Sequence, residues 1–216
     1  MKNNTIDAKL LNAEVAIDNA LDNSAISTAL AAFGYDETKL LAGKALYETA
    51  LNLHLQQKKE YGEQYAATSE LEATLSSANK TYMQHLKVAR IALRTDASAA
   101  EALQLDGRRK KTYAGWVEQA TLFYGNALDS AKIKAALAEF GIDEAKLGAG
   151  QASVQEVQTL LKAQHTEKGE AQAATKARDE ALEALMDWLS DFFAIARIAL
   201  EGDPQLLEML GIVVES

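Results

Sequence analysis

The chain has 216 residues, a formal net charge of −9 and no cysteine. The absence of cysteine excludes disulfides, thiolate-bound zinc, iron–sulfur clusters and thiol nucleophiles. The acidic balance is shared by both halves, with 10 − 14 = −4 for residues 1–107 and 12 − 17 = −5 for residues 108–216. Nucleic-acid-binding proteins use a basic surface, so we expect no nucleic-acid partner. We expect the protein in a reducing compartment, the bacterial cytoplasm.

The sequence contains two similar halves. Residues 1–109 align without a gap on residues 108–216, and 36 of the 109 aligned positions are identical. Asn19–Asp22 recurs as Asn126–Asp129, and Ala89–Leu93 recurs as Ala196–Leu200. We therefore predict two tandem repeat domains, residues 1–107 and residues 108–216, each a bundle of antiparallel helices. As in a homodimer, the two repeats are expected to be related by a pseudo-two-fold axis.

The composition predicts an all-α fold with coiled-coil-like packing, because the apolar content of 48% comes mainly from Ala and Leu and there is one proline. The first predicted helix covers residues 5–21 and recurs over 112–128. A short helix then ends at Phe33, and its copy ends at Phe140. Gly34 and Gly141 follow as helix-terminating glycines, and Asp36 and Asp143 follow as N-caps of the next helix.

The long polar stretch after each N-cap allows two interpretations. Residues 36–94 and 143–200 contain no proline, which is compatible with one very long helix. Their apolar residues, however, lie at the two ends, and a hairpin that folds near residues 62–70 would bring those ends together. The sequence favours the hairpin, which gives each repeat about four helices plus a short closing one (99–103 or 205–210).

The histidines and carboxylates indicate no metal site and no catalytic residue. In the hairpin, His54 and His85 would face each other, but the aligned positions in the second half are Leu161 and Phe192, which indicates packing. The sequence also lacks the Glu-x-x-His motif of di-iron bundles. The repeated carboxylates of Asp36 and Asp143 are explained by capping, and Gly43 and Gly150 by close approach of helices.

Arg90 and its aligned partner Arg197 each lie inside an apolar helical run. Such an arginine must pair with a carboxylate or extend its stem to water. We expect an internal ion pair with one of the repeated acids; an arginine that reaches solvent and an arginine that binds an anionic ligand are the alternatives. The basic run over residues 108–111 is interpreted as the linker between the repeats, with a docking patch for an acidic partner as the alternative.

The sequence favours a non-enzymatic structural or protein-interaction module that needs no cofactor. Its partner is expected to be a protein, or a further copy in a homo-oligomer, bound at exposed hairpin tips around residues 62–68 and 169–175. The alternative is a small-molecule-binding bundle, with or without enzyme activity, that has an aromatic cavity and an arginine that anchors an anion. That cavity would be lined by Trp116, Phe123, Trp188 and Phe192, with Arg197 as the anchor. The candidate cofactor-binding residues are Arg90, Arg197, Trp116 and Trp188. A membrane-active helical protein is a third possibility, but the sequence lacks the basic amphipathic face that such helices use. No membrane span is expected, because the longest apolar stretch is too short and too charged.

Overall fold

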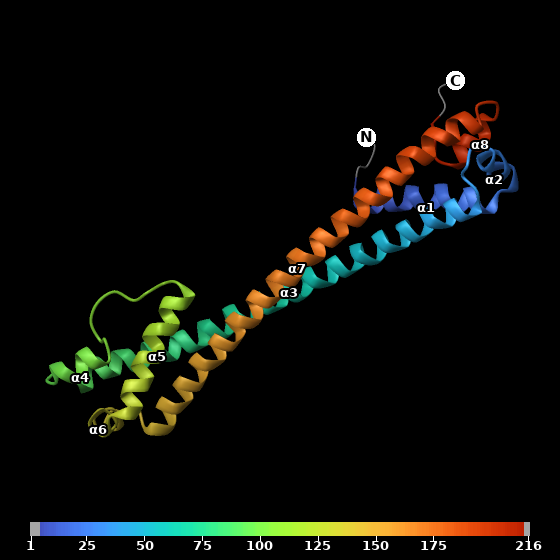
Figure 1. Ribbon diagram of the computed structural model, residues 1–216. Coiled ribbons are helices and arrows are strands. Elements are labelled where there is room, and N and C mark those ends of the chain that lie inside the picture. Colours follow the sequence, from blue (N-terminus) through green and yellow to red (C-terminus); the bar gives the residue numbers. More distant parts are fainter. Residues whose placement is uncertain (1–4, 214–216) are drawn as a thin grey trace. The chain divides into compact units, whose positions relative to one another are not determined.

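The computed structural model describes residues 5–213, and within that range the chain forms helices and no strand (Figure 1). The all-α prediction is therefore confirmed. The helices in chain order are α1 (Ile6–Asp22), α2 (Ser24–Ala31), α3 (Glu37–Ala92), α4 (Ala97–Ala102), α5 (Tyr113–Asp129), α6 (Ala131–Ala138), α7 (Glu144–Ala199) and α8 (Pro204–Met209).

The second set of four helices has the same lengths as the first. Helices α1 and α5 have 17 residues, α2 and α6 have 8, α3 and α7 have 56, and α4 and α8 have 6. Each helix of the second set also begins 107 residues after its counterpart. The offset that aligns the two halves of the sequence therefore also aligns their helices.

Short polar side chains and glycines begin and end these helices; the sequence predicts the caps at Asp36 and Asp143 and the glycines at Gly34 and Gly141, whereas the cap at Thr5 is a finding of the structure. The hydroxyl of Thr5 accepts a hydrogen bond from the backbone N–H of Ala8 at the start of α1. The carboxylate of Asp36 accepts one from the N–H of Lys39 at 2.9 Å and so caps the first turn of α3. Gly34 ends the α2 turn with a φ of +80°, a left-handed conformation that suits glycine. The corresponding caps and glycine are present before α5 and α7.

The predicted hairpins are wrong, because α3 and α7 are each one continuous helix of 56 residues. Residues 62–68 and 169–175 lie inside these helices and form no tips. Gly62 and Gly169, the proposed breaking points, have ordinary helical backbone with open space around them. A single glycine costs a helix only about 1 kcal/mol, which does not suffice to bend it. Each half therefore contains three helices and a short closing one instead of four and a short one.

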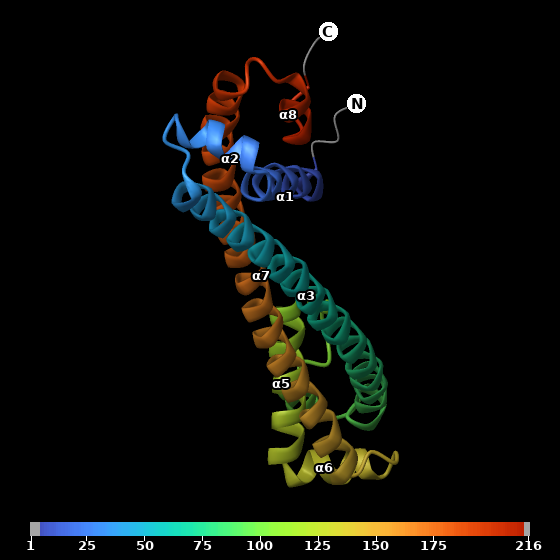
Figure 2. The same cartoon turned by 90° about the vertical axis from the view of Figure 1, so that its right-hand side faces the viewer.

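The chain divides into two compact units that each take residues from both halves of the sequence. Unit 1 comprises Met1–Tyr61 and Glu170–Ser216, and unit 2 comprises Gly62–Gly169. Unit 1 thus contains α1, α2, α8, the first part of α3 and the last part of α7, and unit 2 contains α4, α5, α6 and the other parts (Figures 1 and 2). The division into residues 1–107 and 108–216 stays a prediction about the sequence repeat; the compact units are assembled differently.

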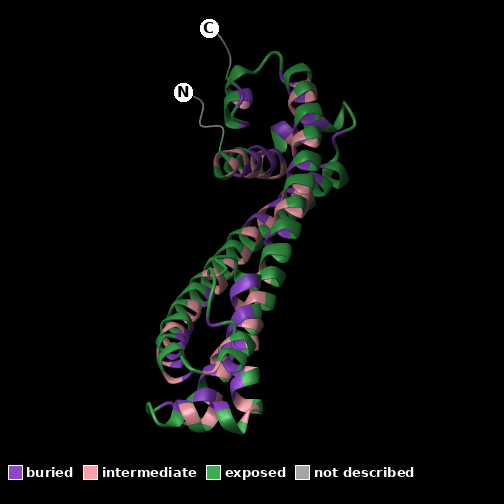
Figure 3. Ribbon diagram, turned by 90° about the vertical axis from the view of Figure 1, so that its left-hand side faces the viewer, coloured by how far each residue is buried: buried purple, intermediate pink, exposed green. Residues whose placement is uncertain are grey.

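Each unit has its own hydrophobic core, and this explains why no hairpin is needed. In unit 1, the N-terminal end of α3 packs with the C-terminal end of α7, through residues such as Leu40 and Phe192. In unit 2, the C-terminal end of α3 packs with the N-terminal end of α7, through residues such as Leu86 and Leu147. The apolar ends of each long helix are thus buried by the other long helix together with the short helices of the same unit. Between these ends both helices are largely exposed (Figure 3).

Helices α3 and α7 are long, but a membrane span must also be apolar. Within residues 5–213, no helix contains a segment that is long and apolar enough to cross a membrane.

Candidate functional site

The four candidate binding residues are divided between the units. Trp116 and Arg90 belong to unit 2, and Trp188 and Arg197 belong to unit 1. The aromatic cavity expected from the sequence is divided in the same way, since Phe123 belongs to unit 2 and Phe192 to unit 1.

Trp116, on the first turn of α5, is held in one orientation. Its side chain is 7% exposed, and its indole N–H donates a hydrogen bond to the Asn79 side-chain oxygen on α3 at 2.8 Å. The ring of Tyr82 meets it edge to face, with 6.2 Å between the ring centroids. Phe123, from the same set of predicted residues, is fully buried and packs edge to face on Tyr82 at 5.5 Å. Trp116 is thus a fixed wall of the unit 2 core.

A groove of about 450 Å³ lies beside Trp116, and we call it the Trp116 groove. One of its sides is the helix α3, and the other is the segment that enters α5. It is lined by Glu72, Leu75, Ser76, Asn79, Met83, Arg109, Lys110, Lys111, Thr112, Tyr113 and Trp116. Three of the four residues of the basic run line this groove, so the run does more than connect the two halves of the sequence.

The basic segment is tied to the rest of unit 2 by several hydrogen bonds. The Arg109 guanidinium donates to the Tyr82 hydroxyl at 3.1 Å and to main-chain oxygens, including that of Gln104 at 2.8 Å. The backbone N–H of Lys110 donates to the Gln119 side-chain oxygen at 2.8 Å, and the Lys110 ammonium pairs with Glu118 on α5. These contacts fix one side of the groove.

Trp188, on α7, packs within the unit 1 core. Its ring is stacked on that of Phe192, with centroids 5.1 Å apart and planes 11° apart, and Tyr35 meets both rings. Its six-membered ring also covers Gly43 on α3, where an added Cβ would lie 2.4 Å from ring carbons. Gly43 is therefore required for close packing, as the sequence predicts. No described cavity is lined by Trp188.

The buried ion pairs expected for Arg90 and Arg197 are wrong, because both residues are exposed. Arg90 donates two hydrogen bonds to the main-chain oxygen of Leu105, at 2.8 and 2.6 Å. Arg197 donates one longer bond of 3.3 Å to the main-chain oxygen of Phe193 on its own helix. Arg90 thus holds the segment after α4 against α3, and Arg197 makes no equivalent contact.

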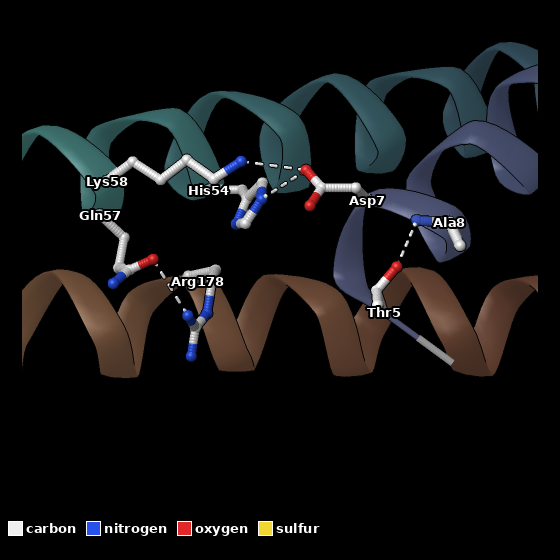
Figure 4. Close-up of polar contacts among 7 residues, drawn as sticks. All are labelled: Thr5, Asp7, Ala8, His54, Gln57, Lys58 and Arg178. Carbon is white, nitrogen blue, oxygen red and sulfur yellow. Dashed lines mark hydrogen bonds and ion pairs between the residues drawn. The ribbon is translucent and has the colours of Figure 1, made fainter. Parts of the chain in front are cut away.

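A second polar cluster joins α1 to α3 in unit 1 (Figure 4). The Asp7 carboxylate contacts Nε2 of His54 at 3.1 Å and the ammonium of Lys58 at 3.0 Å. Hydrogen bonds from Lys58 and His54 hold the pKa of Asp7 below its usual value. Nearby, Arg178 on α7 donates to the side-chain oxygen of Gln57 at 3.1 Å.

The Asp7 cluster resembles part of a catalytic triad only in its Asp–His contact. His54 is 5% exposed, and its Nδ1 is buried with no hydrogen-bond partner among residues 5–213. Among the residues that the structure describes, no hydroxyl or thiol lies within hydrogen-bond distance of that imidazole. We interpret the cluster as a tie between α1 and α3.

His85 and Tyr124 form a buried polar pair in unit 2. Nδ1 of His85 and the Tyr124 hydroxyl are 3.1 Å apart, and the two side chains are 8% and 1% exposed. Burial, together with the charge of Lys146, lowers the pKa of His85, and burial raises the pKa of Tyr124. His54 and His85 thus belong to different units and do not face each other.

Sequence reasoning missed the Trp116 groove and the role of the repeated asparagines. The amide of Asn19 donates to the main-chain oxygen of Met209 at 2.6 Å, and that of Asn126 donates to Ala102 at 2.7 Å. Each asparagine thus holds the last turn of a short helix. The recurrence of Asn-Ala-Leu-Asp was the available signal for this contact. For the groove, the sequence offered a weaker indication: the basic run over residues 108–111 lies only a few positions before Trp116.

Comparisons with protein-family models, with curated proteins and with solved structures find no match to this chain.

Proposed function

We propose that the protein is a non-enzymatic interaction module built from a duplicated helical bundle, in which each unit presents one docking surface to a protein partner. The observation that carries the proposal is a pair of apolar residues exposed to the same extent in both units. Phe33 is 47% exposed in unit 1 and Phe140 is 49% exposed in unit 2. Ile198 is 56% exposed in unit 1 and Ile91 is 55% exposed in unit 2.

These residues occupy equivalent places near the end of a unit. The phenylalanine follows α2 in unit 1 and α6 in unit 2, and the isoleucine lies in the last turn of α7 in unit 1 and of α3 in unit 2. In unit 1, α2, α8 and the last turns of α7 lie together in both views (Figures 1 and 2). Single exposed apolar residues are common on proteins, but the same aromatic and the same β-branched residue at the same two places in both units favour a shared binding role.

Two equal docking surfaces on one chain make the module bivalent. A partner with two copies of the matching surface, or an oligomer of this chain itself, would gain avidity from engaging both units.

The test compares variants of one unit with variants of both. Phe33→Ser with Ile198→Ser removes the surface of unit 1, and Phe140→Ser with Ile91→Ser removes that of unit 2. Proteins cross-linked to the intact chain in its host are identified by mass spectrometry, and the purified partner is then titrated in native mass spectrometry. We expect two partner copies per chain for the intact protein. A variant with both substitutions in one unit should bind one copy, and the variant with all four substitutions should bind none.

Leu55→Ser serves as the control, because Leu55 is 54% exposed but is aligned with Lys162 in the second half. This variant should bind like the intact chain. Binding that survives in the four-site variant, or that is lost equally in Leu55→Ser, would contradict the proposal.

A further inference from the structure

The Trp116 groove carries positive charge that the protein does not neutralise within the groove. Arg109, Lys110 and Lys111 line it against a single acid, Glu72, although the whole chain has a net charge of −9. The Lys110 ammonium pairs with Glu118. The recorded contacts of the Arg109 guanidinium are to main-chain oxygens and to the Tyr82 hydroxyl, which are all neutral.

The Arg109 guanidinium is also not fully satisfied by the protein. Its Nε is closed to solvent and has no hydrogen-bond partner among residues 5–213, so part of the positive charge stays uncompensated. A buried donor without a partner is costly, because it has lost its bond to water without replacing it. Lys111 is exposed at the same groove and places a second cation there. An anion in the groove would supply the missing negative charge.

Four apolar or aromatic side chains line the groove beside the uncharged polar Ser76, Asn79 and Thr112. Leu75 and Met83 come from α3, and Tyr113 and Trp116 come from the first turn of α5. A volume of about 450 Å³ lies within the range of small-molecule sites, which combine apolar walls with a few fixed polar groups. The hydrogen bond from Trp116 to Asn79 and that from Lys110 to Gln119 fix both walls before a ligand arrives.

We propose that the Trp116 groove binds a small organic carboxylate whose aliphatic or aromatic body packs against Trp116 and Met83 and whose head group faces Lys111 and Arg109. This site is independent of the two docking surfaces proposed above, because it is lined by none of their four residues. It also differs from the cavity that the sequence predicted, since Trp116 is the one predicted lining residue that it contains.

The experiment uses the full chain and octanoate as the probe. Isothermal titration calorimetry measures affinity, and the indole N–H resonance of Trp116 in a ¹H–¹⁵N spectrum reports the location; a Trp188→Phe variant assigns the two indole signals. We expect saturable binding of octanoate that shifts the Trp116 signal and leaves that of Trp188 in place. Acetate has the charge without the body, and 1-octanol has the body without the charge. Each should bind at least about tenfold more weakly: acetate because it lacks the alkyl chain that packs against Trp116 and Met83, and 1-octanol because it lacks the charge that faces Lys111 and Arg109.

A charge-reversal variant distinguishes binding in the groove from non-specific attraction of octanoate to the surface charge of the protein. Lys111→Glu should weaken octanoate binding about tenfold, and Lys87→Glu, an exposed lysine of α3 outside the groove lining, makes the same change in net charge and should leave the affinity unchanged. Three results would overturn the proposal. These are no saturable binding of octanoate, equal binding of 1-octanol, or an equal loss of affinity in the two lysine variants.

Discussion

Unit 1 and unit 2 place different side chains at positions 107 residues apart in the sequence. Phe192 is fully buried in unit 1, where unit 2 has His85, and Ile17 is fully buried in unit 1, where unit 2 has Tyr124. The unit 1 pair is apolar, whereas the unit 2 pair is joined by a hydrogen bond of 3.1 Å. A buried histidine is tolerated where a hydroxyl satisfies it and is replaced by phenylalanine where none is present.

The two buried glycines of the long helices, Gly43 and Gly150, are each covered by an aromatic ring that comes from a different helix in each unit. Trp188 of α7 covers Gly43 in unit 1, and Tyr124 of α5 covers Gly150 in unit 2. The position aligned with Trp188 is Thr81, a much smaller residue. Each unit therefore has one large aromatic ring on its glycine, but the ring comes from a different helix. In both units the space above the glycine is filled by an aromatic ring, because protein interiors are close-packed and a cavity is destabilising.

The largest effect is expected from filling these glycines. Gly43→Ala and Gly150→Ala place a Cβ 2.4 and 2.3 Å from ring carbons and should each lower the free energy of unfolding by about 2–3 kcal/mol. Gly62→Ala and Gly169→Ala are matched controls on the same two helices, with nothing near the added Cβ, and should raise it by about 0.5–1 kcal/mol. Urea unfolding followed by circular dichroism measures all four. A stabilising effect of Gly43→Ala would contradict the packing assigned to Trp188.

The next effect concerns the polar pair of unit 2. Tyr124→Phe leaves the buried His85 without its partner and should cost about 2 kcal/mol. His85→Phe together with Tyr124→Phe restores an apolar pair as in unit 1, so the double variant should lose less than the sum of the single variants. A double-mutant cycle of unfolding free energies measures the coupling. Strict additivity would show that the hydrogen bond does not contribute to stability.

A smaller difference is expected between the two aligned arginines. Arg90→Met removes two hydrogen bonds to Leu105 and should cost about 1 kcal/mol. Arg197→Met removes one bond of 3.3 Å and should cost less than about 0.5 kcal/mol. Thermal unfolding of the two variants provides the comparison. Equal losses would mean that the contact to Leu105 contributes nothing beyond the arginine stem.

The smallest expected effect is a dependence of stability on pH. Burial and Lys146 lower the pKa of His85 in the folded protein, so the unfolded chain takes up a proton more readily. The resulting stability is fully present above the unfolded value of about 6.5 and is lost as the pH falls from there through the folded pKa. The urea midpoint of unfolding, measured between pH 7.5 and pH 5, reports this loss of stability. It should fall less steeply with decreasing pH in His85→Phe than in the intact protein. An unchanged slope would indicate that His85 titrates normally.

The local elements can be predicted from composition and spacing alone. The helix class, the cap at Asp36, the glycine at Gly34 and the small residue at Gly43 all follow from propensity, capping chemistry and the comparison of the two halves. These are properties of a few neighbouring residues, and they depend little on what lies far away in the chain.

Only the tertiary structure decided how the elements pair. The apolar ends of α3 could be buried either by a hairpin or by α7, and both pairings satisfy the same hydrophobic pattern. The partner of Arg90 proved to be a main-chain oxygen 15 residues away, which no pattern of side-chain types indicates. The Trp116 groove likewise requires α3 and the basic segment to meet, although they are distant in sequence. Hydrophobic burial is non-directional, so the sequence specifies which faces must be covered, while the covering partner depends on the packing of the whole chain.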